Sequence, residues 1–433
     1  MKHCLASRTR PCRAFFADGL LFRVDDLLYS IARWLVVVLG LSMVGGTVLS
    51  WVRSPHWFIR GWDFPRVQIV GLAGLSAGLY AAFFSYNTWL EWVFIGLCAA
   101  CAAWQFYRIF PYVPLAPEHV ETTTRPADAP SSLRLVASNV LKDNEQHDRW
   151  LDVVRGADPD LILAVEVDET WDDMIEDALG EEYPFQVRQP QDNYYGMVLY
   201  SRLKLIDPEL RFIVQDDVPS VHTGVELRCG RRIYLHGVHP RPPEPLRDED
   251  ATARDAEVVI VGREIEGETE GEQRPVIVAG DFNDVAWSHT SKLFQKVSHL
   301  LDPRKGRGFF NTFDARYPLL RFPLDHVFHS NHFKLINLEL LPFVGSDHFP
   351  VSITLSYEPT APVEQPEPEK SAGDEEEAQE KVERAAEEND EEKVMRNEGA
   401  HPQPQALAPP DPDQEPASPQ EPASPEDEDV RRP

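Results

Sequence analysis

Three long apolar runs near the N-terminus limit this chain more than any other feature of its sequence. Two contain no charged residue: residues 34–52, WLVVVLGLSMVGGTVLSWV, and residues 67–86, VQIVGLAGLSAGLYAAFFSY. A third, residues 92–107, reaches a similar length when Leu90 and Ile109 are included. A helix of about 20 apolar residues crosses the hydrocarbon core of a bilayer. Residues 1–110 therefore predict a membrane region with about three transmembrane helices.

Small residues and tryptophans in this region fit the same prediction. Glycine and alanine allow helices to approach closely in a membrane, and tryptophan prefers the bilayer interface. Cys98 and Cys101 have the spacing of a redox motif, but they lie inside the third apolar run. We favour packing in a membrane helix for this pair. Tryptophans cluster near the ends of the runs: Trp34, Trp51, Trp57, Trp62, Trp89, Trp92 and Trp104.

Basic residues around the runs predict an orientation. Three spans place the N-terminus and the loop between the second and third runs on one side, and that loop has no Lys or Arg. Because basic residues favour the cytoplasmic side, we expect a cytoplasmic N-terminus and the rest of the chain outside, across a bacterial inner membrane. No small-residue cleavage site follows the first run, so we expect no cleaved signal peptide. Arg53, Arg60 and Arg66, in the first loop, oppose this orientation. Six basic residues precede the first run: Lys2, Arg8, Arg10, Arg13, Arg23 and Arg33.

Composition changes twice after the membrane region. Residues 111–132, PYVPLAPEHVETTTRPADAPSS, are rich in Pro, Thr and Ser and predict a linker. Residues 358–433 hold 24 acidic and 7 basic residues and the doubled unit QEPASPQEPASP. Few apolar residues there could offset the entropy lost on ordering, so we predict a disordered acidic, Pro-rich tail whose partner is unknown. The alternative is a short helix around residues 375–393.

Residues 133–357 alternate between strand-like and helix-like segments. Helical spacing appears at residues 148–159 and 248–266. Short apolar runs that end in polar residues occur at 133–141, 160–167, 194–202, 231–240 and 275–284, and PLDHVFHS and SDHFPVSITLS close the segment. This mixture predicts an α/β domain whose central sheets are covered by helices.

Charge and cysteine content exclude little for this central domain. The chain carries a formal net charge of −29. An acidic body argues against tight, unspecific adhesion to nucleic acid, which depends on Lys and Arg, but it is compatible with a bound cation. Cys229 is the one cysteine in this segment, so the segment has no internal disulfide.

Polar residues stand where the apolar runs end. If the runs pair in sheets with these ends together, the residues converge on one edge. Carboxylates there would bind a hard cation such as Mg²⁺ and align an attacking water, while histidines and amides would bind phosphate oxygens. Taken one at a time, each residue also suits a purely structural role, as a strand-end acid, turn former, loop histidine or cap. The residues are Asn139, Glu166, His239, Asp281, Asn283, Asp325, Asp347 and His348.

The order of the motifs SNVL, DPDLILAVEV, VHP, GDFND, PLDHVF and GSDHFPV resembles the endonuclease/exonuclease/phosphatase family of metal-dependent phosphoesterases. The resemblance covers about residues 133–357. It implies a four-layer α/β sandwich, in which two packed β-sheets are flanked by helices. It also implies hydrolysis of phosphodiesters or phosphomonoesters with Mg²⁺ or Mn²⁺. Transmembrane helices before such a domain are similar to the arrangement in bacterial membrane proteins of the family.

The resemblance also implies a role for each site residue. The metal ligands would be Glu166, with Asn139 beside it and Asp347 completing the metal environment. Asp281 would activate or align the attacking water, and Asn283 would hold the phosphate or that water. His239 and His348 would contact the phosphate, and Asp325 would hydrogen-bond His348.

Neighbouring residues depart from the family pattern without removing a catalytic group. Ala164 and Val165 precede Glu166 where family members often carry Leu-Gln, and His326 stands where an aromatic residue is frequent. If the strand alternates, one of Asp325 and His326 faces the site and the other packs in the core.

The leading hypothesis is a membrane-anchored, divalent-metal-dependent phosphoesterase that uses in-line attack by water. Its substrate would be a phosphate ester of nucleic acid, lipid or sugar. Tethering at a bilayer makes lipid headgroups accessible, and the acidic surface slightly disfavours long polyanions. The alternative is a non-catalytic membrane scaffold that uses the same fold and binds partners through its acidic tail. The complete set of candidate catalytic residues argues against the scaffold.

Overall fold

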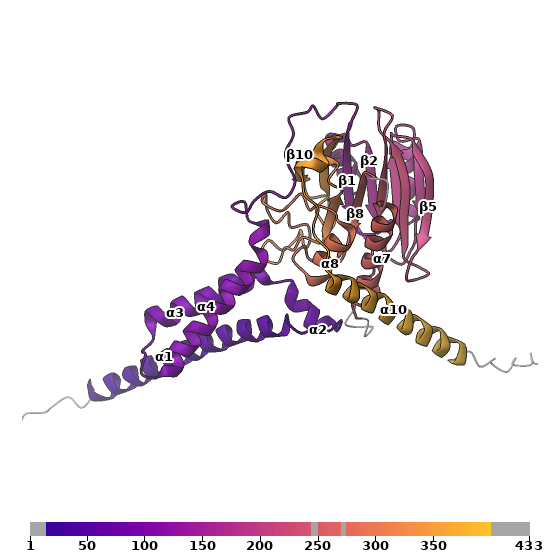
Figure 1. Cartoon of the computed structure of the whole chain (residues 1–433). Coiled ribbons are helices and arrows are strands. Elements are labelled where there is room, and N and C mark those ends of the chain that lie inside the picture. The colour runs from indigo at the N-terminus through magenta and orange to yellow at the C-terminus, as the bar shows by residue number, and fades with distance from the viewer. Residues whose placement is uncertain (1–13, 244–249, 270–273, 400–433) are drawn as a thin grey trace, which may run out of the picture. The chain divides into compact units, whose positions relative to one another are not determined.

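The structure, a computed structural model, describes residues 14–243, 250–269 and 274–399. The chain divides into one unit that ends at Glu387 and a second that begins at Glu388. Residues 400–433, the last part of the predicted tail, lie outside the described residues. Figure 1 shows the N-terminal helices and the body of strands and helices that follows them in the first unit.

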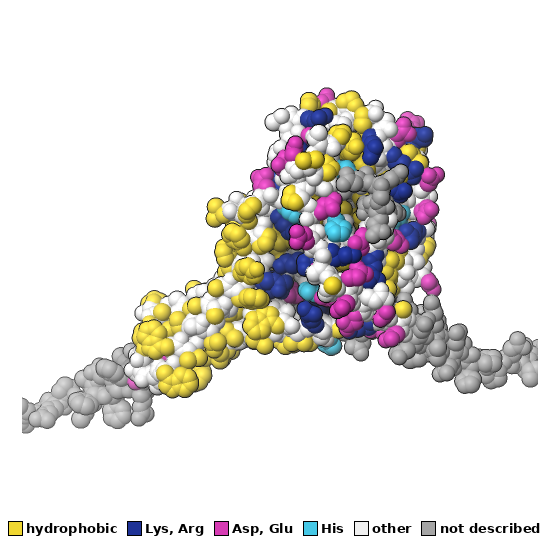
Figure 2. Space-filling model, in the orientation of Figure 1, with side chains coloured by type: hydrophobic (Ala, Val, Ile, Leu, Met, Phe, Trp, Pro, Cys, Tyr) yellow, Lys and Arg dark blue, Asp and Glu magenta, His cyan; other side chains and the backbone are white. Residues whose placement is uncertain are grey.

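Among the described residues, three helices are long and apolar enough to cross a membrane, as the sequence predicts. They are Asp26–Leu49 within α1 (Ala14–Leu49), α3 (Arg66–Phe83), and Trp89–Tyr112, which covers α4 (Trp89–Ile109) and the short η2 (Phe110–Tyr112). Their outward side chains are mostly hydrophobic (Figure 2). The first loop contains α2 (Trp57–Arg60) and η1 (Gly61–Asp63).

Small residues bring these helices together. A Cβ atom on Gly40 would lie 2.7 Å from the Phe94 ring and 2.8 Å from the sulfur of Cys98, so only glycine permits this approach. Thr47 Oγ1 and Cys101 Sγ lie 2.9 Å apart, and both cysteines are buried. The packing interpretation of Cys98 and Cys101 is therefore confirmed.

Two mixed sheets follow. The first has the strand order β10 (Phe333–Leu340), β11 (Val351–Tyr357), β1 (Ser132–Asn139), β2 (Leu161–Val165), β4 (Met197–Ser201) and β3 (Phe185–Gln189). The second has the order β5 (Leu205–Phe212), β6 (Pro219–Glu226), β7 (Arg232–Gly237), β8 (Val276–Asp281) and β9 (Asp325–His329).

Alternating side chains build the layers. On β1, Leu135 points into a core shared by both sheets, where it joins Leu235 of β7 and Ile277 of β8. The next residue, Val136, points to the opposite face and packs with Trp150. Helices α5 (His147–Ala157) and α6 (Glu169–Leu179) cover that face of the first sheet, and α7 (Thr252–Thr269) and α8 (His289–Ser298) cover the second. The four-layer α/β sandwich is confirmed.

Sheet register brings distant polar residues to one edge. Strands β1 and β2 run parallel with Asn139 opposite Val165, so Asn139 and Glu166 leave the sheet at the same end. Strands β8 and β9 run antiparallel with Asp281 opposite Asp325. The ends of the two sheets meet where Asn139 donates to Asp281, a residue 142 positions further along the chain.

The sequence prediction missed several elements for physical reasons. The strands β3, β5 and β10 expose part of one face, and their mixed polarity gives no clear apolar run. Strand β6 is almost fully buried but contains Ser220, His222 and Thr223, which hide its strand character in the sequence. Helices α6 and α8 were also not predicted.

The prediction of a disordered tail is wrong for residues 361–364 and 372–399, which form α9 (Ala361–Glu364) and α10 (Ala372–Gly399). The helix considered as the alternative is present. Cations on the body explain its order: Lys296 Nζ lies 2.8 Å from Asp374, and Arg263 Nη2 lies 2.5 Å from Glu375. Ala378 is also buried against Val259 of α7.

The predicted linker, residues 111–132, contains the end of η2 and the first residue of β1, and it packs on the same body. Val120 is fully buried and joins the core shared by both sheets.

Candidate active site

Asp281, at the end of β8, lies at the centre of a buried polar cluster. Its Oδ2 accepts a hydrogen bond from Asn139 Nδ2 at 3.1 Å. The Nε2 atoms of His348 and His239 lie 3.5 and 4.0 Å from the same oxygen. All four side chains are buried. Four of the eight residues that the sequence analysis expected to converge therefore lie together in the folded chain.

A glycine allows this approach. Gly280 has a φ of +142°, and a Cβ atom there would lie 1.9 Å from the Val238 carbonyl oxygen. Only glycine fits between the ends of β7 and β8, so its position places Asp281 beside His239.

Left-handed backbone occurs at several residues that border the cluster. Leu141, Glu166 and Asn283 have φ values of 57°, 60° and 51°. This conformation is tolerated by Asn but is costly for Leu and Glu. Such strain is common where a backbone must aim side chains into a functional site.

His348 is held by two carboxylates. Its Nδ1 lies 2.7 Å from Asp325 Oδ2, and its ring packs 4.9 Å from the Phe313 ring, centroid to centroid. Burial lowers the pKa of His348, but Asp325 and Asp281 outweigh burial and raise it to about 10. The ring is therefore a cation at neutral pH. The Asp325–His348 contact has the geometry that the sequence analysis expected.

His326 packs away from this cluster, as strand alternation predicts. Its ring nitrogens contact Arg304 Nη2 at 2.7 Å and the Asp284 carbonyl oxygen at 2.8 Å.

Glu166 carries an oxygen with no partner. Its Oε1 accepts from Asn139 Nδ2 at 2.7 Å, whereas its Oε2 is buried without a hydrogen-bond partner among the described residues. Burial raises the pKa of Glu166 to about 7, although the Asn139 hydrogen bond opposes the rise. A hard cation would satisfy the free carboxylate oxygen and remove this cost. The donor set thus fits Mg²⁺ or Mn²⁺.

Asn139 presents its nitrogen to the site. Its Oδ1 accepts from the Leu141 backbone N–H at 3.0 Å, so its Nδ2 faces both Glu166 and Asp281. In this orientation Asn139 acts as a donor to the two carboxylates.

Asp281, Asp325 and His348 form a second group suited to a cation. One ligand atom of each lies within 4.8 Å of the others. Asp347 lies at the rim, where its Oδ2 is 3.3 Å from Arg316 Nη2.

Neutral donors complete the cluster. Burial lowers the pKa of His239 to about 4, against the influence of Asp281, so its ring is neutral. Asn283 donates through Nδ2 to the Pro240 carbonyl oxygen at 3.1 Å, which joins the segment that holds His239 to the end of β8.

A cavity of about 260 Å³ opens beside these residues. The sequence analysis missed its aromatic wall, Tyr194 and Tyr195, because loop tyrosines carry no motif. The Tyr195 ring lies 5.7 Å from the His239 ring. Ser346, within the GSDHFPV motif, was also missed: its Oγ donates to the Asn139 carbonyl oxygen at 2.8 Å and accepts from the His348 N–H at 3.0 Å. The cavity lining is Leu141, Glu166, Asn193, Tyr194, Tyr195, His239, Pro242 and Asn283.

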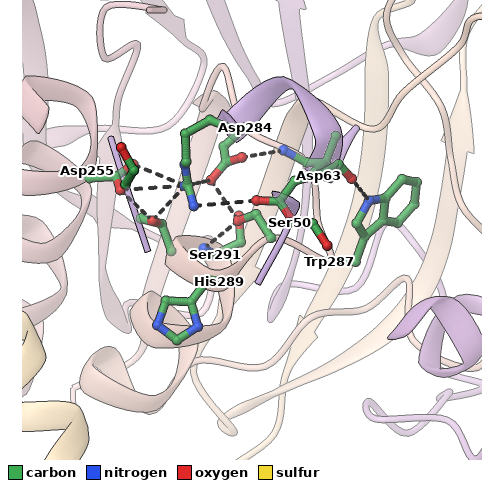
Figure 3. A network of polar contacts seen from close by, with 12 residues as sticks. Ser50, Asp63, Asp255, Asp284, Trp287, His289 and Ser291 are labelled. Atoms are coloured by element: carbon green, nitrogen blue, oxygen red, sulfur yellow. Dashed lines mark hydrogen bonds and ion pairs between the residues drawn. The ribbon is translucent and has the colours of Figure 1, made fainter. Parts of the chain in front are cut away.

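A second buried polar network joins the first loop to the residue after Asn283. Arg60 Nη2 lies 3.5 Å from both Asp255 and Asp284, and it donates to Thr290 Oγ1 at 3.0 Å. Burial lowers the pKa of Arg60, but Asp255 and Asp284 outweigh it and raise the pKa. Figure 3 shows Asp63, Asp255 and Asp284 around this network.

The chain is similar to known proteins in sequence and in structure. A family model described as the Endonuclease/Exonuclease/phosphatase family matches residues 132–348. The catalytic domain of human Nocturnin is 18% identical, with 52% of this chain and 95% of that chain covered and a TM-score of 0.44. A family protein from Bacteroides thetaiotaomicron is 18% identical over 53% and 96%, with a TM-score of 0.43. Sphingomyelinase C from Streptomyces griseocarneus is 18% identical over 52% and 99%, with a TM-score of 0.40. The search of curated proteins found no match.

Proposed function

The chain belongs to the endonuclease/exonuclease/phosphatase family, and from this premise we propose that it is a membrane-anchored phosphoesterase that requires a divalent cation. One observation carries the proposal: Glu166, whose buried carboxylate oxygen has no partner among the residues that the structure describes, lies in the same cluster as Asp281, His239 and His348. A purely structural role gives no reason to bury this oxygen without a partner.

Glu166 and Asp347 would hold Mg²⁺ or Mn²⁺, with Asn139 orienting Glu166 as a hydrogen-bond donor. When bound, the cation would neutralise charge on the phosphoryl oxygens. The second acidic group, which contains Asp325, is occupied by its contact with the cationic His348 ring. For this reason we favour the Glu166 side of the cluster for the metal.

Asp281 would orient the attacking water. Burial raises the pKa of Asp281, but the cationic His348 ring and the hydrogen bonds from Asn139 and the Asn283 N–H outweigh burial and lower it, so the carboxylate is ionised and accepts hydrogen bonds. Asn283 would hold the phosphate or the water. The cationic His348 and the neutral His239 would donate to phosphoryl oxygens as negative charge develops. The water oxygen bonds to phosphorus, one ester P–O bond breaks, and the leaving oxygen takes a proton.

The test uses the full chain in detergent micelles with a soluble phosphodiester and a soluble phosphomonoester. We expect hydrolysis with Mg²⁺ or Mn²⁺, loss with chelator, and a fall of at least about 100-fold in Asp281→Asn and His348→Ala. Glu182→Gln, at an exposed ion pair, is the control and keeps its rate. Full activity in Asp281→Asn would refute the role assignments. A folded protein inactive on soluble, lipid and nucleic-acid esters would favour the scaffold.

We also propose that α1, α3 and α4 cross the membrane with the catalytic domain outside. The arginines of the first loop oppose this orientation less than they do in the sequence, because Arg60 and Arg66 pair with buried carboxylates such as Asp63. Cys229 is exposed on the catalytic domain, so labelling of its thiol shows on which side of the membrane the domain lies.

In intact cells, a membrane-impermeant maleimide should label Cys229 in a variant with Cys4→Ser and Cys12→Ser. Labelling only after cell lysis would contradict this orientation and put the catalytic domain on the cytoplasmic side.

A further inference from the structure

The loop before β9 carries an exposed apolar group next to the candidate active site. Tyr317, Leu319 and Leu320 are 59%, 85% and 55% exposed. Arg316 and Arg321 flank them in the sequence. Three large apolar side chains gathered in one short exposed loop indicate a surface that meets an apolar partner.

This loop contacts the start of a proposed span. Gln68 Nε2 donates to the Leu319 carbonyl oxygen at 2.9 Å. Gln68 is the third residue of α3, so it lies about 3 Å along the axis from the first residue of that helix. The Phe322 ring packs 5.6 Å from the ring of Phe64, which lies just before α3. The loop is therefore level with the point at which α3 would enter the bilayer.

The composition of the loop suits that depth. Tyrosine and arginine are favoured at headgroup level, and leucine side chains are favoured in the acyl region just below it. An apolar group held against the first turn of a transmembrane helix has the lipid surface as its nearest apolar partner. The occupant we commit to is thus the bilayer itself, continuous with the bilayer around α3.

The same loop is bonded to the segment that holds His348. The Ala315 N–H donates to the Asp347 carbonyl oxygen at 2.7 Å, and Arg316 Nη2 lies 3.3 Å from Asp347 Oδ2. The Phe313 ring packs on the His348 ring. The proposed membrane contact at Leu319 and the proposed phosphate contact at His348 are therefore connected through neighbouring, directly bonded residues.

We propose that the loop of residues 316–321 lies in the membrane surface and that the site hydrolyses the phosphate ester of a lipid headgroup. This inference rests on the proposed function. A phospholipid phosphate sits at headgroup level, next to this loop, whereas an extended polyanion would meet a chain of net charge −29. Water adds to phosphorus of the diester, one P–O ester bond breaks, and the products are a phosphomonoester and an alcohol.

The first experiment tests the location of the loop without using activity. Leu319→Cys, in a full chain with Cys4, Cys12 and Cys229 replaced by Ser, is labelled with an environment-sensitive dye and reconstituted into phosphatidylcholine–phosphatidylglycerol vesicles. Doxyl-labelled phosphatidylcholine should quench this dye at least twofold more than a dye at Val363→Cys, an equally exposed residue of α9. Equal quenching at the two positions would overturn the membrane placement.

The second experiment tests the substrate class. In the same vesicles, Leu319→Ser/Leu320→Ser should release phosphorylated product from lipid at least tenfold more slowly than the unaltered chain. Its hydrolysis of a soluble phosphodiester should stay within twofold, and Val363→Ser should match the unaltered chain on both substrates. Equal loss on both substrates, or faster cleavage of an oligonucleotide than of lipid, would overturn the inference. Failure of the unaltered chain on every soluble ester would instead refute the proposed function.

Discussion

Replacing Arg60 tests whether the first loop is locked to the catalytic domain. The Arg60 side chain is 11% exposed, and its guanidinium lies 3.5 Å from oxygens of Asp63, Asp255 and Asp284. Arg60→Ala removes a cation that three largely buried carboxylates share. Asp284 directly follows Asn283, so the change also acts at the edge of the candidate active site.

The expected loss of stability depends on which cations remain beside each carboxylate after Arg60 is replaced. Breaking a buried ion pair from one side costs about 3–5 kcal/mol. Here Asp63 keeps Arg66, while Asp255 keeps Arg254 and Lys381. We therefore expect the lower end, about 3 kcal/mol. For a domain the size of residues 133–357, that corresponds to a fall in Tm of roughly 6–12 °C.

The assay is thermal unfolding of the full chain in detergent micelles, with Arg202→Ala as the matched control. Arg202 pairs with two carboxylates, but these belong to Asp158 and Glu182, which are 68% and 53% exposed. Exposed pairs contribute about 1 kcal/mol or less, so the control should lose under about 4 °C. A Tm loss for Arg60→Ala no larger than that of the control would refute the buried-network argument.

Three further predictions follow from the same structure. Glu166→Gln should weaken Mg²⁺ binding, measured by calorimetry, by at least about tenfold, and an unchanged affinity would contradict Glu166 as a ligand. Burial lowers the pKa of His326 to about 3 and of His329 and His332 to about 4, so these rings are neutral when folded. Below pH 6.5 the unfolded chain binds protons that the folded chain does not, and each such histidine lowers the free energy of unfolding by up to about 1.4 kcal/mol per pH unit. Denaturant unfolding should show this loss between pH 7 and pH 5 and a smaller one in His326→Phe; a flat profile would contradict it. Gly280→Ala should destabilise the domain by more than about 2 kcal/mol, because its Cβ meets the Val238 carbonyl, whereas Gly230→Ala, at an open positive-φ position, should cost less.

The sequence was sufficient to predict the structure of a segment where the residues of that segment determine it by themselves. A run such as residues 67–86 has no charge that would oppose a bilayer, so its length and composition predict a helix of spanning length without knowledge of the rest of the chain. Motifs such as GDFND end in residues that suit the end of a strand, and their order along the chain was enough to indicate the family and the set of candidate site residues.

Other features depend on partners that are distant in the sequence. The acidic segment at 372–387 looks like a solvated tail, and only the cations and apolar residues of the body that it meets explain its order. The nitrogen-forward orientation of Asn139 is set by the Leu141 N–H, which no sequence pattern records.

By itself, the sequence determined the three apolar helices, the α/β character of the body and the set of candidate site residues, because hydrophobic period and side-chain chemistry are local properties. Only the tertiary structure decided that Glu166 has an oxygen without a partner in the described part of the chain, that Arg60 is buried among carboxylates and that Leu319 lies beside the start of α3. Those facts depend on through-space distances between segments that lie far apart along the chain. Sheet register and helix packing set these distances, and residue order alone does not.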